Sequence, residues 1–152
     1  DENDTKIEFA QDTLAVTNCL VNGKEMLLSD YIADNNIDTQ LPLVADYNGT
    51  LINVSIKSVS AENKTVDLYA PVFAGKEYRF AKPVSDYEKG FAERLKPFTE
   101  LSPIFSCNCI LNYKYGKLEG VSTPPFSGPV TFGEIAYQLL NQTLVYAVVA
   151  EK

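Results

Sequence analysis

A run of eight residues near the middle of the chain restricts the fold more than any other feature of the sequence. Polar and apolar side chains alternate through most of Leu51–Ser58, and a period of two places the apolar ones on a single face of a β-strand. The pairs Asn48-Gly49 and Asn63-Lys64 flank the run, and such pairs are typical of tight turns between antiparallel strands. The sequence therefore predicts a β-meander with one buried face.

Short apolar segments on both sides of this run extend the predicted sheet, and short links between strands favour antiparallel neighbours. The segment 103–111 is apolar and bounded by turns, which is typical of a buried strand. The following segment, 112–129, is rich in proline and glycine and is predicted to be an irregular loop. The other expected strands are 7–10, 14–20, 65–73, 77–81, 130–137 and 143–149.

Two segments have the helical period instead. In 24–35 the apolar residues recur at helical spacing, with aspartates on the opposite side. In 86–96 three apolar residues form one stripe, and Ser85 with Glu88 makes a capping box before it. The expected fold class is α+β, a mostly antiparallel sheet with two packed helices, in a single domain of residues 1–152.

Charge and composition exclude several classes of function. The formal net charge is −7, which disfavours nucleic acid and anionic membrane surfaces as partners. The chain contains no histidine, and this removes Ser-His-Asp and Cys-His catalysis, histidine-ligated haem and most catalytic zinc sites. No phosphate-binding glycine loop or cysteine-pair metal motif is present. We expect a protein that is not an enzyme, with no catalytic residue, metal site or cofactor, although a pair of carboxylates could still perform acid–base chemistry.

Cysteine usage bears on the cellular compartment. Three cysteines, an odd number without a dense framework, indicate reduced thiols and a cytoplasmic location. Cys107 and Cys109 alternate with polar residues, so on a strand both thiols share one face, which favours burial over pairing. Five Asn-x-Ser/Thr triplets would be glycosylation acceptors in a secreted eukaryotic protein, so secretion stays an alternative. A start at Asp1 is expected if a leader was removed or if the chain is a piece of a longer protein.

Five residues in the last third of the chain are candidates for binding a ligand. Glu134 is flanked by apolar residues, and a buried carboxylate there would need a partner, either a cationic group of a ligand or backbone donors. Cys107 is a candidate pocket wall, or a small buried hydrophobe. Phe126 and Phe132 could line an apolar pocket or belong to the core. Asn141 could face the ligand or satisfy backbone groups of a turn.

Four short motifs follow one another over residues 23–149: a tyrosine in the first helix (Tyr31), Ser106-Cys107, Phe132–Ile135 and Asn141–Thr143. Their order resembles that of the C-terminal domain of the FIST sensory proteins. An arginine expected shortly after the Ser-Cys pair is replaced by Ile110-Leu111. The resemblance implies a sensory module of bacterial signalling proteins that binds small ligands such as amino acids and adjoins a FIST N-type or other signalling domain.

Two hypotheses of function follow. The leading one is a small-molecule-binding sensory domain in which ligand binding shifts the conformation of the 112–129 loop. The alternative is a protein-interaction or structural module without a small ligand, which would bury an apolar patch on a partner.

Overall fold

The computed structural model describes residues 4–135 and 138–149. The chain divides into two compact units, Asp1–Pro83 (unit 1) and Val84–Lys152 (unit 2). Most strand pairs are antiparallel, and two helices have seven residues or more. The expected α+β class is therefore confirmed. A single domain over residues 1–152 stays a prediction, because compactness within each unit does not decide whether the units fold independently.

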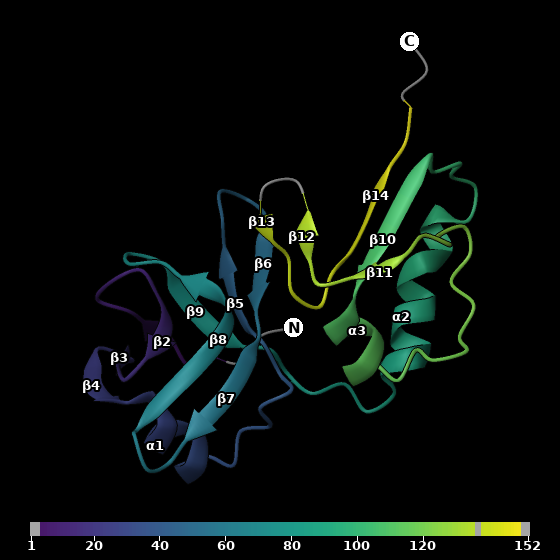
Figure 1. The fold of residues 1–152 in the computed structure, drawn as a ribbon. Helices are drawn as coiled ribbons and strands as arrows, with labels where there is room; N and C mark the ends of the chain where they lie inside the picture. Colours follow the sequence, from purple (N-terminus) through teal and green to yellow (C-terminus); the bar gives the residue numbers. More distant parts are fainter. Residues whose placement is uncertain (1–3, 136–137, 150–152) are drawn as a thin grey trace. The chain divides into compact units, whose positions relative to one another are not determined.

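Unit 1 is built from two antiparallel sheets whose strands are continuous at the corners (Figure 1). The chain passes from β2 (Thr13–Val16) to β3 (Asn18–Val21) across a break at Thr17, and from β6 (Leu51–Val54) to β7 (Ile56–Ser60) across a break at Ser55. At each break it leaves one sheet and enters the other. The Tyr69 N–H donates to the carbonyl of Ser55 at 2.9 Å and holds the second corner. The six-stranded sheet has the order β4 (Lys24–Leu27), β3 (Asn18–Val21), β1 (Ile7–Glu8), β9 (Glu77–Phe80), β5 (Leu43–Asp46), β6 (Leu51–Val54), and the three-stranded sheet the order β2 (Thr13–Val16), β8 (Thr65–Val72), β7 (Ile56–Ser60).

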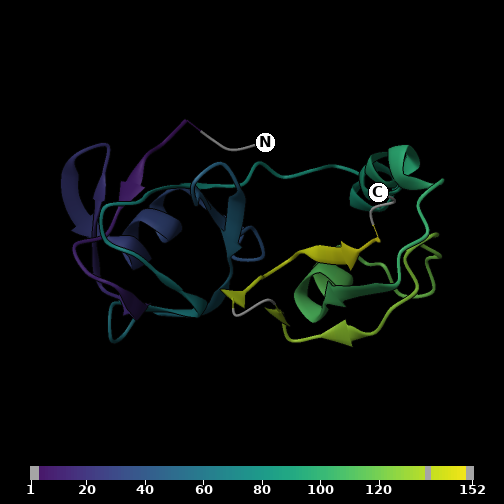
Figure 2. The ribbon, with the colours of Figure 1, turned by 90° about the horizontal axis from the view of Figure 1, so that it is seen from above.

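The core of unit 1 lies between these sheets and a short helix. Helix α1 (Leu28–Asp34) packs against β4 and β8 (Figure 2) and buries Leu28, Tyr31 and Ile32. Tyr78 is fully buried, so its hydroxyl needs partners within the protein. It accepts the Phe73 N–H at 2.8 Å and lies 2.8 Å from the hydroxyl of Tyr47. The Tyr78 hydroxyl is therefore hydrogen-bonded, and burying its ring does not carry the free-energy cost of an unpaired polar group.

The helix predicted for 24–35 is wrong in its first four residues, which form β4 and pair with β3. The reason is the turn that precedes them. Asn22 and Gly23 have φ angles of 48° and 80°, and two consecutive residues at positive φ make the hairpin turn whose twist matches antiparallel strands. The pairing of β4 with β3 overrides the helical spacing of the side chains.

Unit 2 has a small mixed sheet and more helix. Strand β10 (Phe105–Cys109) is central, parallel to β11 (Val130–Thr131) and antiparallel to β14 (Leu144–Ala147). Strands β12 (Glu134–Ile135) and β13 (Gln138–Leu139) form a separate antiparallel pair. The helices are α2 (Tyr87–Leu95), the 3₁₀ turn η1 (Lys96–Phe98) and α3 (Ile110–Tyr115).

Three expectations for unit 2 need correction. The strand predicted for 103–111 ends at Cys109, and the chain passes directly into α3, so the expected loop at 112–129 begins as helix. Two short strands, β11 and β12, replace the strand predicted for 130–137, of which residues 136–137 lie outside the described part. The N-cap of α2 is Asp86, not Ser85. Within 4–135 and 138–149, no helix is long and apolar enough to cross a membrane.

The cap of α2 gives a testable prediction. The Asp86 carboxylate accepts the Lys89 N–H at 3.0 Å, so Asp86→Ala should lower the free energy of unfolding by about 1 kcal/mol. Ser85→Ala is the matched control and should change it by less than about 0.5 kcal/mol. Urea unfolding of both variants measures the difference, and an equal loss in the two would show that Asp86 is not the cap.

Candidate ligand-binding pocket

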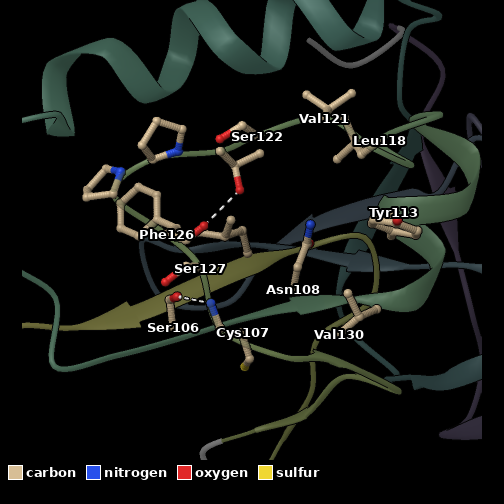
Figure 3. Close-up of a pocket in the computed structure, with 15 residues that line it drawn as sticks. Ser106, Cys107, Asn108, Tyr113, Leu118, Val121, Ser122, Phe126, Ser127 and Val130 are labelled. Carbon is tan, nitrogen blue, oxygen red and sulfur yellow. Dashed lines mark hydrogen bonds between the residues drawn. The ribbon is translucent and has the colours of Figure 1, made fainter.

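Unit 2 contains a half-open cavity of about 460 Å³ (Figure 3). That volume lies within the range of roughly 300–1,000 Å³ that small-molecule sites occupy. Residues of β10, α3, β11 and β14 contribute to the lining, and the segment from Leu118 to Gly128 contributes most of the rest. The cavity is therefore bounded by the sheet on one side and by the loop after α3 on the other.

Alternation along β10 decides which side chains reach the cavity. Ser106 and Asn108 pair with Tyr146 and Leu144 of β14, and side chains of directly opposed residues lie on the same face of a sheet. Figure 3 shows Asn108 rising into the cavity, whereas the Cys107 sulfur points away from the other lining residues. Cys107 therefore borders the cavity without offering its thiol to it.

The thiols of Cys107 and Cys109 are both free and buried, which confirms that their spacing favours burial over pairing. Burial raises the pKa of the Cys107 thiol above its ordinary value, against a smaller opposing effect of its hydrogen bond with Thr131. A thiol held in its protonated form is a weak nucleophile. Cys107 therefore behaves as a small hydrophobic residue.

The loop closes on β10 through an unusually tight backbone approach. The Gly128 N–H donates to Ser106 Oγ at 3.0 Å, and the Asn108 N–H donates to the carbonyl of Pro129 at 3.0 Å. A Cβ atom at position 128 would lie 1.5 Å from the carbonyl oxygen of Ser106, a distance that no non-bonded pair can adopt. Only glycine therefore lets the loop reach the strand.

Phe126 contributes its ring to the cavity wall and belongs to an aromatic cluster with Phe98 and Tyr146. Phe126 is buried, with its ring centroid 4.9 Å from that of Tyr146 and 6.4 Å from that of Phe98. A pair of hydrogen bonds of 2.8 Å between Thr123 and Phe126, from Thr123 Oγ1 to the Phe126 carbonyl and from the Phe126 N–H to the Thr123 carbonyl, holds the turn that carries this ring. The expected lining residue Phe126 is thus part of the cavity wall.

A chain of three polar side chains leads from α2 to the cavity. The Tyr87 hydroxyl donates to Asn112 Oδ1, and Asn112 Nδ2 donates to Asn108 Oδ1 at 2.7 Å. Asn112 is only 1% exposed, so both ends of its amide depend on these two bonds. Burial raises the pKa of the Tyr87 hydroxyl, with a smaller opposing effect of Arg94, and the group remains protonated at neutral pH. We call these three residues the amide relay.

The amide relay leaves one polar group facing the cavity. Nδ2 of Asn108 makes no hydrogen bond to any residue that the structure describes, and in Figure 3 it points toward the space beside Val121 and Leu118. None of the residues lining the cavity is an aspartate, glutamate, lysine or arginine. The described lining thus combines apolar walls, an amide donor and hydroxyl groups, without a formal charge. Over 4–135 and 138–149, no cluster of three or more histidine, cysteine, aspartate or glutamate side chains is arranged to hold a metal ion.

The structure brings only two of the five candidate residues to this cavity, Cys107 and Phe126. Phe132 is 78% exposed and Asn141 is buried, and neither lines the cavity. Glu134 is exposed on the short pair of β12 with β13. The hypothesis of a buried carboxylate in an apolar setting is wrong for Glu134, because water solvates its side chain and no cationic partner is needed.

Sequence reasoning missed the amide relay. The available signal was the polar pair Ser106 and Asn108 within an otherwise apolar strand, with Asn112 one helical turn further on. Nothing in the sequence connects Tyr87 to Asn112, since 25 residues separate them. Hydrogen bonds between side chains this far apart depend on tertiary packing.

Comparison with known proteins gives one match. A family model described as a family of unknown function (DUF6976) matches residues 1–150. No curated protein and no solved structure matches the chain at a significant level.

The tight approach of the loop gives a testable prediction. Gly128→Ala should destabilise unit 2 by about 2–3 kcal/mol, because the new methyl group forces the loop off β10. Gly90→Ala is the control: its Cβ would meet nothing closer than Val84 Cγ1 at 3.6 Å, and alanine should stabilise α2 by up to about 1 kcal/mol. Thermal and urea unfolding measure both effects. A harmless Gly128→Ala would contradict this account of the loop.

Proposed function

The chain belongs to the DUF6976 family of unknown function, and we propose that it binds an uncharged small molecule in the cavity of unit 2. The observation that carries the proposal is a cavity of about 460 Å³ whose lining joins apolar side chains to hydroxyl groups and to an unpaired amide donor directed into it. Small-molecule sites typically combine a mostly apolar lining with a few polar groups that fix orientation.

The lack of charge in the described lining favours a neutral ligand. A free amino acid would bring an ammonium and a carboxylate group into a cavity that has no opposite charge to pair with either. Burying an unpaired charge costs far more than burying a paired or neutral polar group. We therefore favour an uncharged ligand over the amino acids that the FIST resemblance implies.

A sensory role is part of the proposal. The loop after α3 supplies much of the lining, so a ligand that contacts it would favour the closed arrangement of the loop over any open one. A neighbouring signalling domain could respond to this shift. The resemblance to the FIST C-terminal domain supports such a role and stays a hypothesis. The three free thiols, all buried, support a reducing compartment such as the cytoplasm.

The proposal predicts stabilisation by neutral ligands. In a thermal-shift screen of uncharged metabolites and fragments, a ligand at 100 times its dissociation constant should stabilise the fold by about 2.7 kcal/mol. Ser122 is exposed on the cavity lining, so Ser122→Trp should fold normally and abolish the shift by filling the opening with its indole ring.

Glu134→Gln is the matched control, because this exposed residue does not line the cavity, and it should respond to ligand as the unmodified chain does. Loss of the response in Glu134→Gln but not in Ser122→Trp would move the site to β12. A complete absence of hits at millimolar concentration would argue against the proposal.

A second candidate function is self-association through the sheet of unit 2. Strand β14 ends that sheet among the described strands, and Leu144–Val149 contains no charged residue. Beside it, Ile104 is 71% and Val149 is 70% exposed. An uncharged edge strand of this kind is a ready template for pairing with a second copy of itself.

Self-association can be measured by sedimentation velocity at several protein concentrations. If the edge pairs with its copy, the sedimentation coefficient should rise with concentration, and Val149→Lys should abolish the rise. Leu14→Lys, at a residue of unit 1 that is 52% exposed, is the control and should leave it unchanged. A monomer at every concentration would rule out this candidate.

A further inference from the structure

We infer that the cavity selects ligands carrying a carbonyl-type hydrogen-bond acceptor, read by Asn108, with Tyr87 and Asn112 as positioning residues. The inference rests on the proposed function, since it names the class of ligand for the same cavity. It starts from the amide relay, in which each bond has a donor and an acceptor of known identity.

The direction of the relay follows from counting donors and acceptors. If the Asn108 amide alone were reversed, its NH₂ group would face the NH₂ group of Asn112, and two donors cannot bond to each other. If both amides were reversed, Asn112 Nδ2 would donate to the Tyr87 oxygen. The Tyr87 hydroxyl hydrogen would then need another acceptor, and the described structure gives it none besides Asn112 Oδ1. Only the observed direction gives every donor and acceptor of the relay a partner among the described residues, apart from the Asn108 amide group that faces the cavity.

The position of the Tyr87 ring is itself fixed by packing. The ring stacks on Phe91 with centroids 5.9 Å apart and an interplanar angle of 14°. The Tyr87 ring also contacts the C-terminal end of α3. A Cβ atom at Gly116 would lie 2.6 Å from ring carbons Cδ1 and Cε1. A glycine at this position leaves the space that the ring needs to aim its hydroxyl at Asn112.

The cavity end of the relay therefore presents a donor. Nδ2 of Asn108 points toward the side of the cavity that Leu118 and Val121 line (Figure 3), where a donor is costly to leave unbonded once water is displaced. A ketone, amide or ester oxygen meets this need without a charge. A ligand lacking an acceptor would displace the water that satisfies Nδ2 without replacing its hydrogen bond.

Acetophenone and α-methylstyrene form a matched probe pair, because they have nearly the same shape and differ in a carbonyl oxygen against a CH₂ group. Side-chain amide resonances in ¹H–¹⁵N spectra report binding at Asn108 directly. Acetophenone should bind the full chain about five times more tightly than α-methylstyrene, the ratio that one ordinary neutral hydrogen bond gives. Its binding should also shift the Asn108 Nδ2 resonance.

Tyr87→Phe tests the positioning role, because it keeps the ring against Phe91 and removes only the hydroxyl. Without that hydroxyl the Asn112 and Asn108 amides can reverse together, and the preference for acetophenone should fall to about one. Tyr47→Phe is the control: it removes a hydroxyl bonded to Tyr78 in unit 1 and should leave the preference unchanged. Asn108→Leu tests the recognition step itself, independently of Tyr87→Phe: it removes the amide donor and should abolish the preference, and a preference that survives it overturns the inference.

The outcomes separate the two proposals. If no fragment, neutral or charged, binds in the cavity, the proposed function fails and the inference fails with it. If both probes bind the unmodified chain equally, the cavity is a ligand site but Asn108 does not select an acceptor. A preference that survives in Tyr87→Phe overturns the positioning role of the relay.

Discussion

One buried amide, that of Asn112, joins the three elements on which unit 2 is built. Its side chain is almost completely excluded from solvent, and a buried amide left unpaired at either end would cost about 1–3 kcal/mol. It is paired at one end with Tyr87, the first residue of α2, and at the other with Asn108 on β10. Because α2 has no buried residue of its own, this polar contact and the ring of Tyr87 provide much of what holds the helix in place.

The same requirement explains why an unpaired amide donor faces the cavity. Asn112 pairs with Tyr87 through its Oδ1 atom and with Asn108 through its Nδ2 atom. The one donor of the relay that these bonds leave without a partner is Nδ2 of Asn108. The loop after α3 forms the opposite wall because Gly128 allows its backbone to contact Ser106 and because Phe126 packs on Tyr146. Between these two attachments the loop lies over the sheet without filling the space. The stability of the small core of unit 2 and the presence of the cavity therefore depend on the same contacts: the amide relay and the two attachments of the loop.

Local patterns along the chain were reliable where neighbouring residues decide the structure. Alternation at Leu51–Ser58 predicted strands, and the stripe of Tyr87, Phe91 and Leu95 predicted a helix. These local patterns failed where contacts with other parts of the chain decide the structure. Residues 24–27 have helical spacing but become β4 because the turn at Asn22-Gly23 pairs them with β3. Glu134 drew attention because its sequence neighbours are apolar, yet the side chain is exposed on a short strand pair. Apolar neighbours in sequence do not determine burial, since successive residues of a strand point to opposite sides.

By itself, the sequence determined the fold class, the exclusion of histidine-based chemistry and the burial of Cys107 and Cys109, because period, composition and alternation are properties of the chain alone. The sequence also suggested Phe126 as a residue that lines a pocket. The cavity and the amide relay were decided only by tertiary structure. Tyr87, Asn108 and Asn112 come from three different elements, and the hydrogen bonds between them exist only once packing has brought α3 against β10 and Tyr87 of α2 against α3. Which side chain faces a cavity is set by that packing, and no local pattern records it.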